Sequence, residues 1–269
     1  MLSSISKEII LRKNYLTNQK ISSIYFGGGT PSVLDAKEIK SLLKTIFNYY
    51  KIAPAVEITL ECNPDDLSGT KLSEWKDIGI NRLSIGVQSF CNTDLKFMNR
   101  KHSAEEAIQS IKLAQKFEFQ NISIDLIYGL PKQTLKKWKN NVEQLFSLSV
   151  PHFSAYALTI EKNTTLYHLV KNKKINPLTD NKTNAQFNLL QIEAKKRGFI
   201  HYEISNFGRK KFFSKHNISY WNDNHYLGVG PSAHSYNGKT RCWNVASNKQ
   251  YIFSVNSNQK FFDEEVLSV

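Results

Sequence analysis

The feature of this sequence that most constrains its fold is a repeated alternation between short apolar runs and longer amphipathic segments. The short runs are rich in β-branched and aromatic residues and predict six strands, over 22–26, 56–61, 82–87, 122–127, 153–159 and 199–204. The segments between them have helical periodicity and predict helices over 35–50, 68–78, 104–117, 135–148 and 179–197. Strands that alternate with helices are typical of right-handed βαβ crossovers and a parallel sheet. We therefore predict an α/β fold, and a partial parallel (β/α) barrel rather than an open doubly wound sheet.

Two of the predicted helices begin with a recognisable capping pattern. Asp35 is followed three residues later by Glu38, and Ser103 by Glu106. In such a pair each side chain accepts a hydrogen bond from the other residue's backbone amide. Both pairs predict capping boxes that fix where the helices start.

Composition and charge narrow the class of protein. The 269 residues are 41% hydrophobic and 12% aromatic, which is typical of a globular chain and not of a disordered one. The net charge of +13 raises the possibility of nucleic-acid binding. However, 30 of the 36 basic residues are lysines spread along the sequence and only 6 are arginines, whereas recognition of bases and phosphates favours clustered arginine. Nucleic-acid binding therefore remains an alternative that is supported by charge and by no motif.

Cysteine spacing and hydropathy indicate the compartment. Cys62, Cys91 and Cys242 are far apart in the sequence and include no CxxC pair. A disulfide framework is therefore not expected. No apolar run is long enough to cross a bilayer, and no secretory signal is recognisable. These features predict a cytoplasmic protein without a transmembrane segment.

Polar residues gather at the predicted carboxyl ends of the strands, which is where parallel α/β sheets bind ligands. They are the GGGTP motif at 27–31, Glu61, Gln88 and Asp125, with Arg100 a little further along. Bare glycine backbone, two carboxylates, an amide and a guanidinium suit a zwitterionic ligand with a diol. The alternative is that GGGTP forms a tight turn and that neighbouring strands satisfy the carboxylates.

Three motifs in this order and spacing carry a resemblance to a known family: GGGTP at 27–31, NRLSIGVQSF at 81–90 and IDLIYGLPKQT at 124–134. Over residues 21–236 the chain resembles the radical S-adenosylmethionine (SAM) enzymes of the oxygen-independent coproporphyrinogen III oxidase family. Its haem-chaperone branch is indicated by LTIE at 158–161, by HNxxYW at 216–221 and by YLGVGPSAH at 226–234.

The resemblance implies two small-molecule sites. It assigns SAM contacts to nine positions, the last two of which align less closely: Gly28, Gly29, Thr30, Glu61, Gln88, Arg100, Asp125, Thr159 and His234. It assigns haem binding to His216 and Tyr220, with His216 as the expected iron ligand and His225 or His234 as substitutes. The aromatic residues around His216 would form the apolar face that a porphyrin needs, or would simply pack the core.

The chain also departs from the family pattern. The family holds a [4Fe-4S] cluster with a CxxxCxxC loop after its first barrel strand, and no such loop occurs between Met1 and Val269. We therefore expect a fragment or degenerate form that lacks the first strand, the cluster ligands and the end of the C-terminal domain, with no catalytic residue assigned. The expected domains are the barrel, 1–206, and the start of a C-terminal region, 207–269.

The resemblance implies a haem chaperone that binds haem and SAM and passes haem to an unidentified acceptor protein, with peripheral contact to membrane haem proteins. One alternative is an oxygen-independent coproporphyrinogen III oxidase of porphyrin biosynthesis. The other is the basic nucleic-acid-binding protein that the charge suggests.

Overall fold

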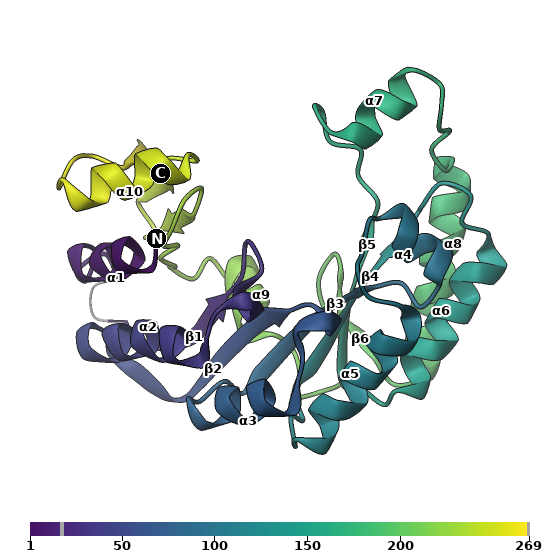
Figure 1. The fold of residues 1–269 in the computed structure, drawn as a ribbon, viewed down its shortest axis with the longest axis horizontal. Coiled ribbons are helices and arrows are strands. Elements are labelled where there is room, and N and C mark those ends of the chain that lie inside the picture. Colours follow the sequence, from purple (N-terminus) through teal and green to yellow (C-terminus); the bar gives the residue numbers. More distant parts are fainter. Residues whose placement is uncertain (17–18, 268–269) are drawn as a thin grey trace. The chain divides into compact units, whose positions relative to one another are not determined.

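The computed structural model describes residues 1–16 and 19–267. Contacts divide the chain into two compact units (Figure 1). Unit 1 comprises Met1–Tyr25, Leu34–Glu57 and Ser214–Val269, and unit 2 comprises Phe26–Val33 and Ile58–Phe213. The predicted boundary between residues 206 and 207 separates a barrel from a C-terminal region. The two units are defined by contacts and do not test that boundary, so it stays a prediction.

The largest sheet has seven strands in the order β1-β2-β3-β4-β5-β7-β6. Their bounds are β1 (Ile21–Phe26), β2 (Ile52–Cys62), β3 (Arg82–Gln88), β4 (Ile122–Tyr128), β5 (His152–Ala157), β6 (Ile200–His201) and β7 (Asn206–Gly208). Strands β2 to β5 pair in parallel, each with the next along the chain. The predicted α/β class with a parallel sheet is therefore confirmed for these strands.

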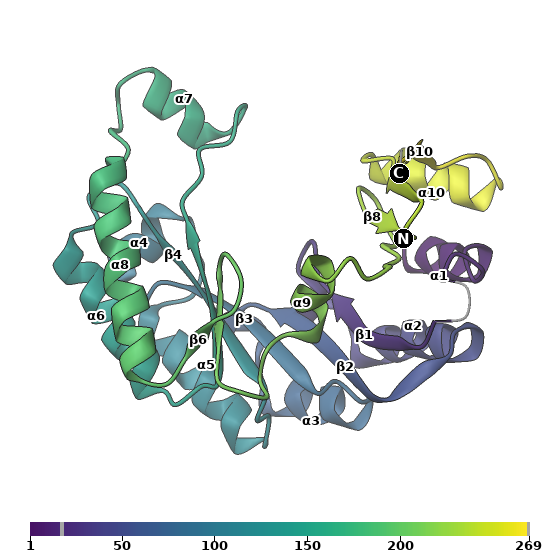
Figure 2. The same cartoon turned by 180° about the vertical axis from the view of Figure 1, so that it is seen from behind.

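Unit 2 contains the four helices predicted there and two that the sequence did not predict. The predicted helices are α3 (Gly69–Asp77), α5 (Ala104–Lys116), α6 (Leu135–Ser147) and α8 (Asp180–Lys196). The other two are α4 (Asn92–Phe97) and α7 (Thr165–Lys171), and the 3-10 turns are η1 (Pro31–Val33) and η2 (Pro64–Asp66). Helices α3, α5, α6 and α8 lie along one side of the strands (Figure 1), whereas α7 stands away from them (Figure 2). The predicted capping box at Ser103 and Glu106 begins α5.

Alternation along the strands separates the two faces of the sheet in unit 2. In β4, Ile122, Ile124 and Leu126 are almost fully buried. Successive strand residues point to opposite faces, so these side chains share the face on which Tyr128 packs against Trp138 of α6, with ring centroids 5.6 Å apart. Ser123 and Asp125 therefore lie on the other face. One face builds the core with the helices, and the other is free to carry polar groups.

The sixth predicted strand is wrong in length and in its neighbour in the sheet. Instead of one parallel strand over 199–204, the chain forms the two-residue β6, turns, and continues as β7, which is antiparallel to both β5 and β6. The turn is closed by a hydrogen bond from the Tyr202 amide to the Asn206 carbonyl, 3.2 Å long. The Glu203 carboxylate accepts a second bond, from the Ser205 amide. These local contacts end β6 at His201, although the strand-like pattern of the sequence continues to residue 204.

Unit 1 contains α1 (Leu2–Leu11), α2 (Ala36–Tyr49), α9 (Lys215–Trp221) and α10 (Asn248–Asn256). A capping box at Asp35 and Glu38 begins α2, as predicted. Three antiparallel strands form a second sheet in the order β10-β9-β8: β8 (His234–Tyr236), β9 (Thr240–Asn244) and β10 (Phe262–Val266). Tyr251, Val255 and Phe261 form a buried apolar cluster in unit 1. The sequence pattern after residue 206 predicted none of these strands.

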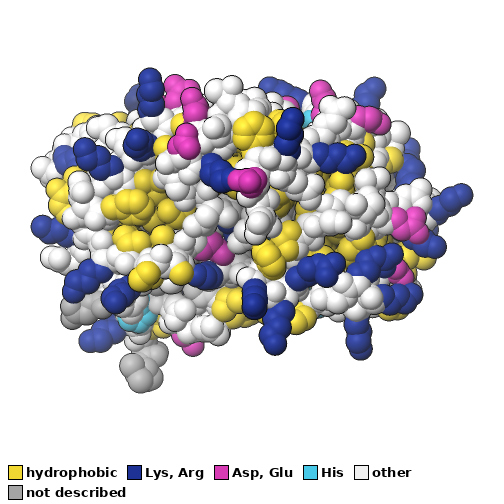
Figure 3. Space-filling view, turned by 90° about the horizontal axis from the view of Figure 1, so that it is seen from below, with side chains coloured by type: hydrophobic (Ala, Val, Ile, Leu, Met, Phe, Trp, Pro, Cys, Tyr) yellow, Lys and Arg dark blue, Asp and Glu magenta, His cyan; other side chains and the backbone are white. Residues whose placement is uncertain are grey.

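Within the described residues, no helix is long and apolar enough to cross a membrane. In the view of Figure 3, lysine and arginine side chains are spread over the surface, with carboxylates and apolar side chains between them. On this face the basic side chains are thus dispersed rather than gathered into one basic patch.

Candidate functional site

The glycine motif after β1 presents bare backbone. Gly28 has a φ of 86°, a conformation that side chains rarely adopt, and its amide donates a 3.3 Å hydrogen bond to the Glu61 carboxylate at the end of β2. A Cβ added at Gly28 or Gly29 would meet no atom within 4 Å. The glycines are therefore not needed for tight packing, and they leave open backbone beside a carboxylate, as a ligand cradle requires.

Asp125 lies on the polar face of β4 and accepts hydrogen bonds of 3.1 and 3.3 Å from the Ser84 hydroxyl. Burial raises the pKa of the Asp125 carboxyl to about 6, because removal from water disfavours the charged form. The hydrogen bond from Ser154 opposes this shift, and the negative charge of Glu61 adds to it. The Asp125 carboxyl and the neighbouring Glu61 charge make this part of unit 2 a suitable place for a cationic ligand.

Gln88 is aimed by an irregularity at the end of β3. The pairing of β3 with β4 shifts register between Ile85 and Gln88, and Gln88 has a φ of 68°. A bulge of this kind redirects a side chain. A Cβ added at Gly86 would lie 2.9 Å from the Gln88 side-chain nitrogen, so glycine at this position leaves room for that side chain in the observed orientation. The bulge and the glycine of the local sequence IGVQ therefore favour this orientation of Gln88.

Arg100 follows α4 and donates a 3.4 Å hydrogen bond to the Asn63 side-chain oxygen. Burial lowers the pKa of Arg100, while the charges of Asp65 and Asp125 oppose that change. The guanidinium borders a cavity of about 280 Å³ that is also lined by Lys96. Arg100 thus supplies positive charge in a unit whose strand ends carry carboxylates, as a zwitterionic ligand would need.

Sequence analysis missed several polar residues on the same face of the sheet. The deepest is His152 of β5, fully buried, whose Nδ1 lies 2.7 Å from the Ser123 hydroxyl and 3.3 Å from the Arg82 guanidinium. Because arginine only donates, Nδ1 must accept, and Nε2–H donates to the Tyr202 hydroxyl 2.8 Å away. Burial lowers the pKa of His152 well below its usual value, so the ring stays neutral.

A signal for this polar face was present in the sequence. Polar residues recur at every second position in three consecutive strands: Arg82 and Ser84, Ser123 and Asp125, and His152 and Ser154. Alternation with period two marks one face of a strand. The polar positions of neighbouring strands therefore come together wherever their register matches, as Asp125 and Ser154 do.

Two predicted SAM contacts are less well placed. Thr159 lies beyond the end of β5 with an exposed side chain. His234 begins β8 in unit 1, also exposed, with its ring 6.5 Å from that of Trp243. Gly28, Glu61, Gln88, Arg100 and Asp125 all belong to unit 2, whereas His234 does not.

The HNxxYW motif forms α9, which is fixed at its start by a buried carboxylate. Glu57 of β2 accepts hydrogen bonds from the amides of Lys215 and His216, both 3.2 Å long. The His216 ring stacks on Tyr25 with centroids 4.4 Å apart, and its Nε2 lies 3.2 Å from the Tyr220 hydroxyl. Sequence analysis missed Glu57 and Tyr25, because nothing in the pattern marked them as partners of this helix.

At the other end of the α9 motif, aromatic side chains reach the surface. Tyr220 is 46% exposed and Trp221 57% exposed. Partial burial raises the pKa of Tyr220, with a smaller contribution from Tyr226, so the phenol keeps its proton at neutral pH. The predicted pair His216 and Tyr220 is therefore in direct contact, beside an exposed aromatic surface.

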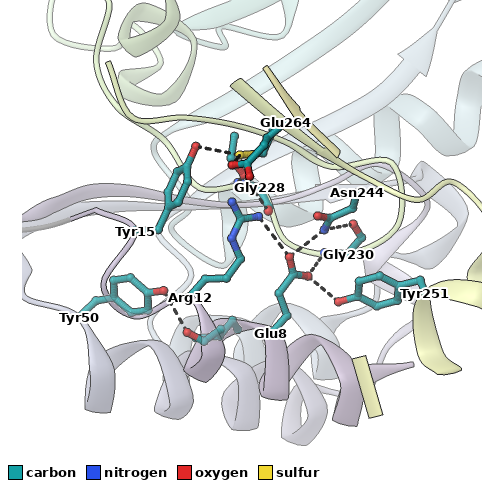
Figure 4. Close-up of polar contacts among 12 residues, drawn as sticks. Glu8, Arg12, Tyr15, Tyr50, Gly228, Gly230, Asn244, Tyr251 and Glu264 are labelled. Atoms are coloured by element: carbon teal, nitrogen blue, oxygen red, sulfur yellow. Dashed lines mark hydrogen bonds and ion pairs between the residues drawn. The ribbon is translucent and has the colours of Figure 1, made fainter. Parts of the chain in front are cut away.

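A second buried carboxylate holds the glycine-rich turn of unit 1 (Figure 4). Glu8 of α1 is fully buried and accepts hydrogen bonds from the Gly230 amide at 2.8 Å, the Asn244 side chain at 2.8 Å and the Tyr251 hydroxyl at 2.6 Å. The Arg12 guanidinium lies 3.5 Å away. One side chain thus joins α1, the turn before β8, β9 and α10.

Comparison with known proteins identifies the class. The profile of the radical SAM superfamily matches residues 5–145, more than half of the chain. This chain belongs to the radical SAM superfamily. That superfamily implies SAM and a [4Fe-4S] cluster as its cofactors.

Particular relatives are more specific. The chain is 37% identical over 250 residues to the heme chaperone HemW of Lactococcus lactis, which covers 93% of this chain. It is 38% identical over 253 residues to the mitochondrial radical S-adenosyl methionine domain-containing protein 1 of Dictyostelium discoideum, covering 87% of this chain. The chain spans 66% of the length of the Lactococcus relative and 56% of the Dictyostelium one.

The predicted fold class is confirmed by a solved structure, coproporphyrinogen III oxidase (HemN) from Escherichia coli. The two superpose with a TM-score of 0.83 at 23% sequence identity, over 100% of this chain and 64% of that one. At this identity the likeness shows the fold, a radical SAM barrel of the kind that the sequence motifs predicted.

The residues of unit 2 fit one of the two cofactors. Open glycine backbone, the Glu61 and Asp125 carboxylates and the Arg100 guanidinium suit the amino, carboxylate, sulfonium and ribose groups of SAM. For the cluster, the described residues contain no group of three or more His, Cys, Asp or Glu side chains that could hold a metal. Burial also raises the pKa of Cys62 well above its usual value, which disfavours the thiolate. These residues therefore fit the nucleotide and offer no site for the cluster.

Proposed function

We propose that this protein is a haem chaperone that binds haem at α9, binds SAM at the carboxyl ends of the unit 2 strands, and passes haem to an acceptor protein. The observation that carries the proposal is the exposed aromatic surface of α9, where Tyr220 and Trp221 stand beside the contact between Tyr220 and His216. Haem needs an apolar surface and an axial ligand, and both are present within one seven-residue helix. The similarity to HemW over 93% of the chain supports this assignment.

Charge near α9 supports the same proposal. Lys215, the first residue of the helix, is exposed, and its ammonium group reaches the Ala55 carbonyl at 2.6 Å. A cation on the same short helix as Tyr220 and Trp221 suits the anionic propionates of haem. In contrast, the carboxylates on the polar face of unit 2 would repel those propionates. Haem is therefore assigned to α9, and the cationic sulfonium ligand to unit 2.

The haem site is tested by titrating the full chain with hemin and recording the Soret band. Trp221→Ala should weaken binding at least threefold, because it removes exposed apolar surface from α9. Phe253→Ala is the matched control, since Phe253 is 59% exposed on α10 and belongs to no proposed site. Equal binding by wild type and by a Trp221→Ala, Tyr220→Ala double variant would contradict the proposal.

The SAM site is tested by calorimetry with SAM and S-adenosylhomocysteine. The Arg100→Gln, Asp125→Asn double variant should lose binding, whereas Asp77→Asn, an exposed change at the end of α3, should not. SAM carries the sulfonium charge that S-adenosylhomocysteine lacks. Wild type should therefore prefer SAM, and the preference should shrink in Asp125→Asn. Unchanged binding by the double variant would show that the ligand lies elsewhere.

The sequence leaves two other functions open. The chain shares the fold of coproporphyrinogen III oxidase, but the 23% identity to HemN is evidence for the fold and not for that activity. Nucleic-acid binding gains no support from the comparisons, and the dispersed charge of Figure 3 does not favour it.

A further inference from the structure

The direct contact between His216 and Tyr220 bears on which of the two would be the axial ligand of haem. The two side chains are one helical turn apart, and the Tyr220 hydroxyl lies 3.2 Å from His216 Nε2. Their rings meet edge to face, with centroids 5.1 Å apart and an interplanar angle of 85°. Nε2 is the imidazole nitrogen farther from the backbone. In this structure it faces a phenol.

Iron would have little room at that nitrogen. A metal bound to imidazole lies in the ring plane, about 2 Å from the nitrogen and along its lone pair. With the phenol oxygen only 3.2 Å from Nε2, an iron on that line would come within roughly 1–2 Å of the oxygen. One face of the imidazole is also covered by Tyr25, stacked at 4.4 Å and 22°. Ligation by Nε2 of His216 would require Tyr220 to leave.

Hydrogen bonds to the backbone at the start of α9 hold the His216 imidazole in this position. The Glu57 carboxylate, 5% exposed, accepts the His216 amide and the Lys215 amide. The Ser214 hydroxyl accepts the Asn217 amide at 3.2 Å, as an N-cap. With its backbone capped and its ring stacked, His216 has little freedom to turn Nε2 toward a haem.

Tyr220 is placed differently. Its side chain is 46% exposed, and Trp221, 57% exposed, follows it in the chain. Tyr226 also contacts the Tyr220 ring edge to face, with centroids 4.7 Å apart. Tyr220 therefore belongs to an exposed aromatic surface that a porphyrin could cover, and its hydroxyl is in hydrogen-bonding contact with the His216 imidazole.

We propose that Tyr220 is the axial ligand of ferric haem in this protein and that His216 is a positioning residue that holds the Tyr220 oxygen. The inference rests on the proposed haem site at α9 and deepens it. As the Tyr220 oxygen bonds to iron, its O–H bond breaks and the proton moves to Nε2 of His216. The resulting imidazolium N–H then donates back to the phenolate. Tyrosine is an established haem ligand, and this arrangement requires no movement of α9.

The experiment uses the full chain with one equivalent of hemin. Absorption, EPR and resonance Raman spectra should show high-spin ferric haem with tyrosinate vibrations. Tyr220→Phe should abolish these vibrations and weaken binding at least tenfold. Tyr49→Phe is the matched control, because Tyr49 is 42% exposed on α2 and should leave the spectra unchanged.

Variants of His216 separate the two roles. His216→Ala should keep the tyrosinate vibrations while weakening binding several-fold, and His216→Gln should restore part of the affinity because its side-chain N–H can donate to the phenolate. If Tyr220→Phe keeps the wild-type spectra and His216→Ala loses them, His216 is the ligand and the inference is overturned, while the haem site stands. If neither variant changes binding or spectra, the proposed haem site at α9 fails as well.

Discussion

Replacing Glu8 should destabilise unit 1 more than any surface change, because Glu8 is a fully buried carboxylate with four partners (Figure 4). Glu8→Ala removes the acceptor for the Gly230 amide, the Asn244 side chain and the Tyr251 hydroxyl. It also leaves the Arg12 guanidinium, 8% exposed, without its carboxylate. We expect the loss to be dominated by this uncompensated cation.

The magnitude follows from these contacts. Hydrogen bonds to a charged group contribute about 1.5–3 kcal/mol each, but three that share one acceptor are not additive. Removing one partner of a buried ion pair costs about 3–5 kcal/mol. The Arg12 guanidinium keeps contacts with the faces of Tyr15 and Phe262, 4.4 and 5.1 Å from their ring centroids, which moderate its cost. We therefore expect Glu8→Ala to lower the free energy of unfolding by about 4 kcal/mol.

Two milder variants separate the contributions. Glu8→Gln keeps the shape and one acceptor oxygen but loses the charge, and should cost less than Glu8→Ala. Tyr251→Phe removes one hydrogen bond and leaves the ion pair, and should cost about 2 kcal/mol. Glu265→Ala on β10 is the exposed control and should change stability by less than about 0.5 kcal/mol.

The assay is urea denaturation followed by circular dichroism, combined with hydrogen exchange of peptides that contain Gly230. Destabilisation should appear as a lower midpoint at an unchanged m-value. Exchange should accelerate in residues 228–234, because Glu8 holds the Gly230 amide. A Glu8→Ala midpoint within experimental error of Glu265→Ala would refute the reasoning. It would mean that the free-energy cost of desolvating the Glu8 carboxylate equals the stabilisation from its contacts.

Three further predictions concern unit 2. The folded-state pKa of Asp125, about 6, lies above its ordinary 3.8, so ionisation of Asp125 costs stability. The free energy of unfolding of wild type should therefore fall relative to that of Asp125→Asn as the pH rises through 6. Urea midpoints at several pH values will show this difference. Gly29→Ala should fold normally because its Cβ meets nothing within 4 Å, yet it should weaken SAM binding in calorimetry by filling the cradle. Gly28→Ala should additionally lower the melting temperature, since a φ of 86° strains alanine by about 1–2 kcal/mol; an unchanged melting temperature would contradict this.

The parts of the fold that the sequence predicted are those with a strong local pattern. Strands β3 and β4 begin at Arg82 and Ile122, the residues that the apolar runs predicted. The sequence failed where contacts distant in the chain decide the structure. Residues 199–204 have the composition of a strand, but β5 pairs with β7, so the apolar run is interrupted by a turn that no periodicity marks.

The same distinction applies to the candidate sites. Glu61 and Asp125 were predicted because parallel strands bring their carboxyl ends together, so position in the sequence fixes position in space. Glu57 could not be predicted as a partner of α9, because its contacts with Lys215 and His216 span 158 and 159 residues. The relation of Nε2 to the Tyr220 hydroxyl was also out of reach, since it depends on side-chain rotamers that a motif does not specify.

The two-faced strands of unit 2 have a consequence for how such a protein can diverge. Substitutions at Ile122, Ile124 and Leu126 are constrained by volume, because these side chains are almost completely buried. Ser123 is fully buried as well, but it and Asp125 also serve hydrogen bonds and a ligand. Mutations that keep side-chain volume at every second position of a strand can therefore change ligand preference with little effect on packing. A lineage could exchange one small-molecule specificity for another while the helices and their contacts stay unchanged.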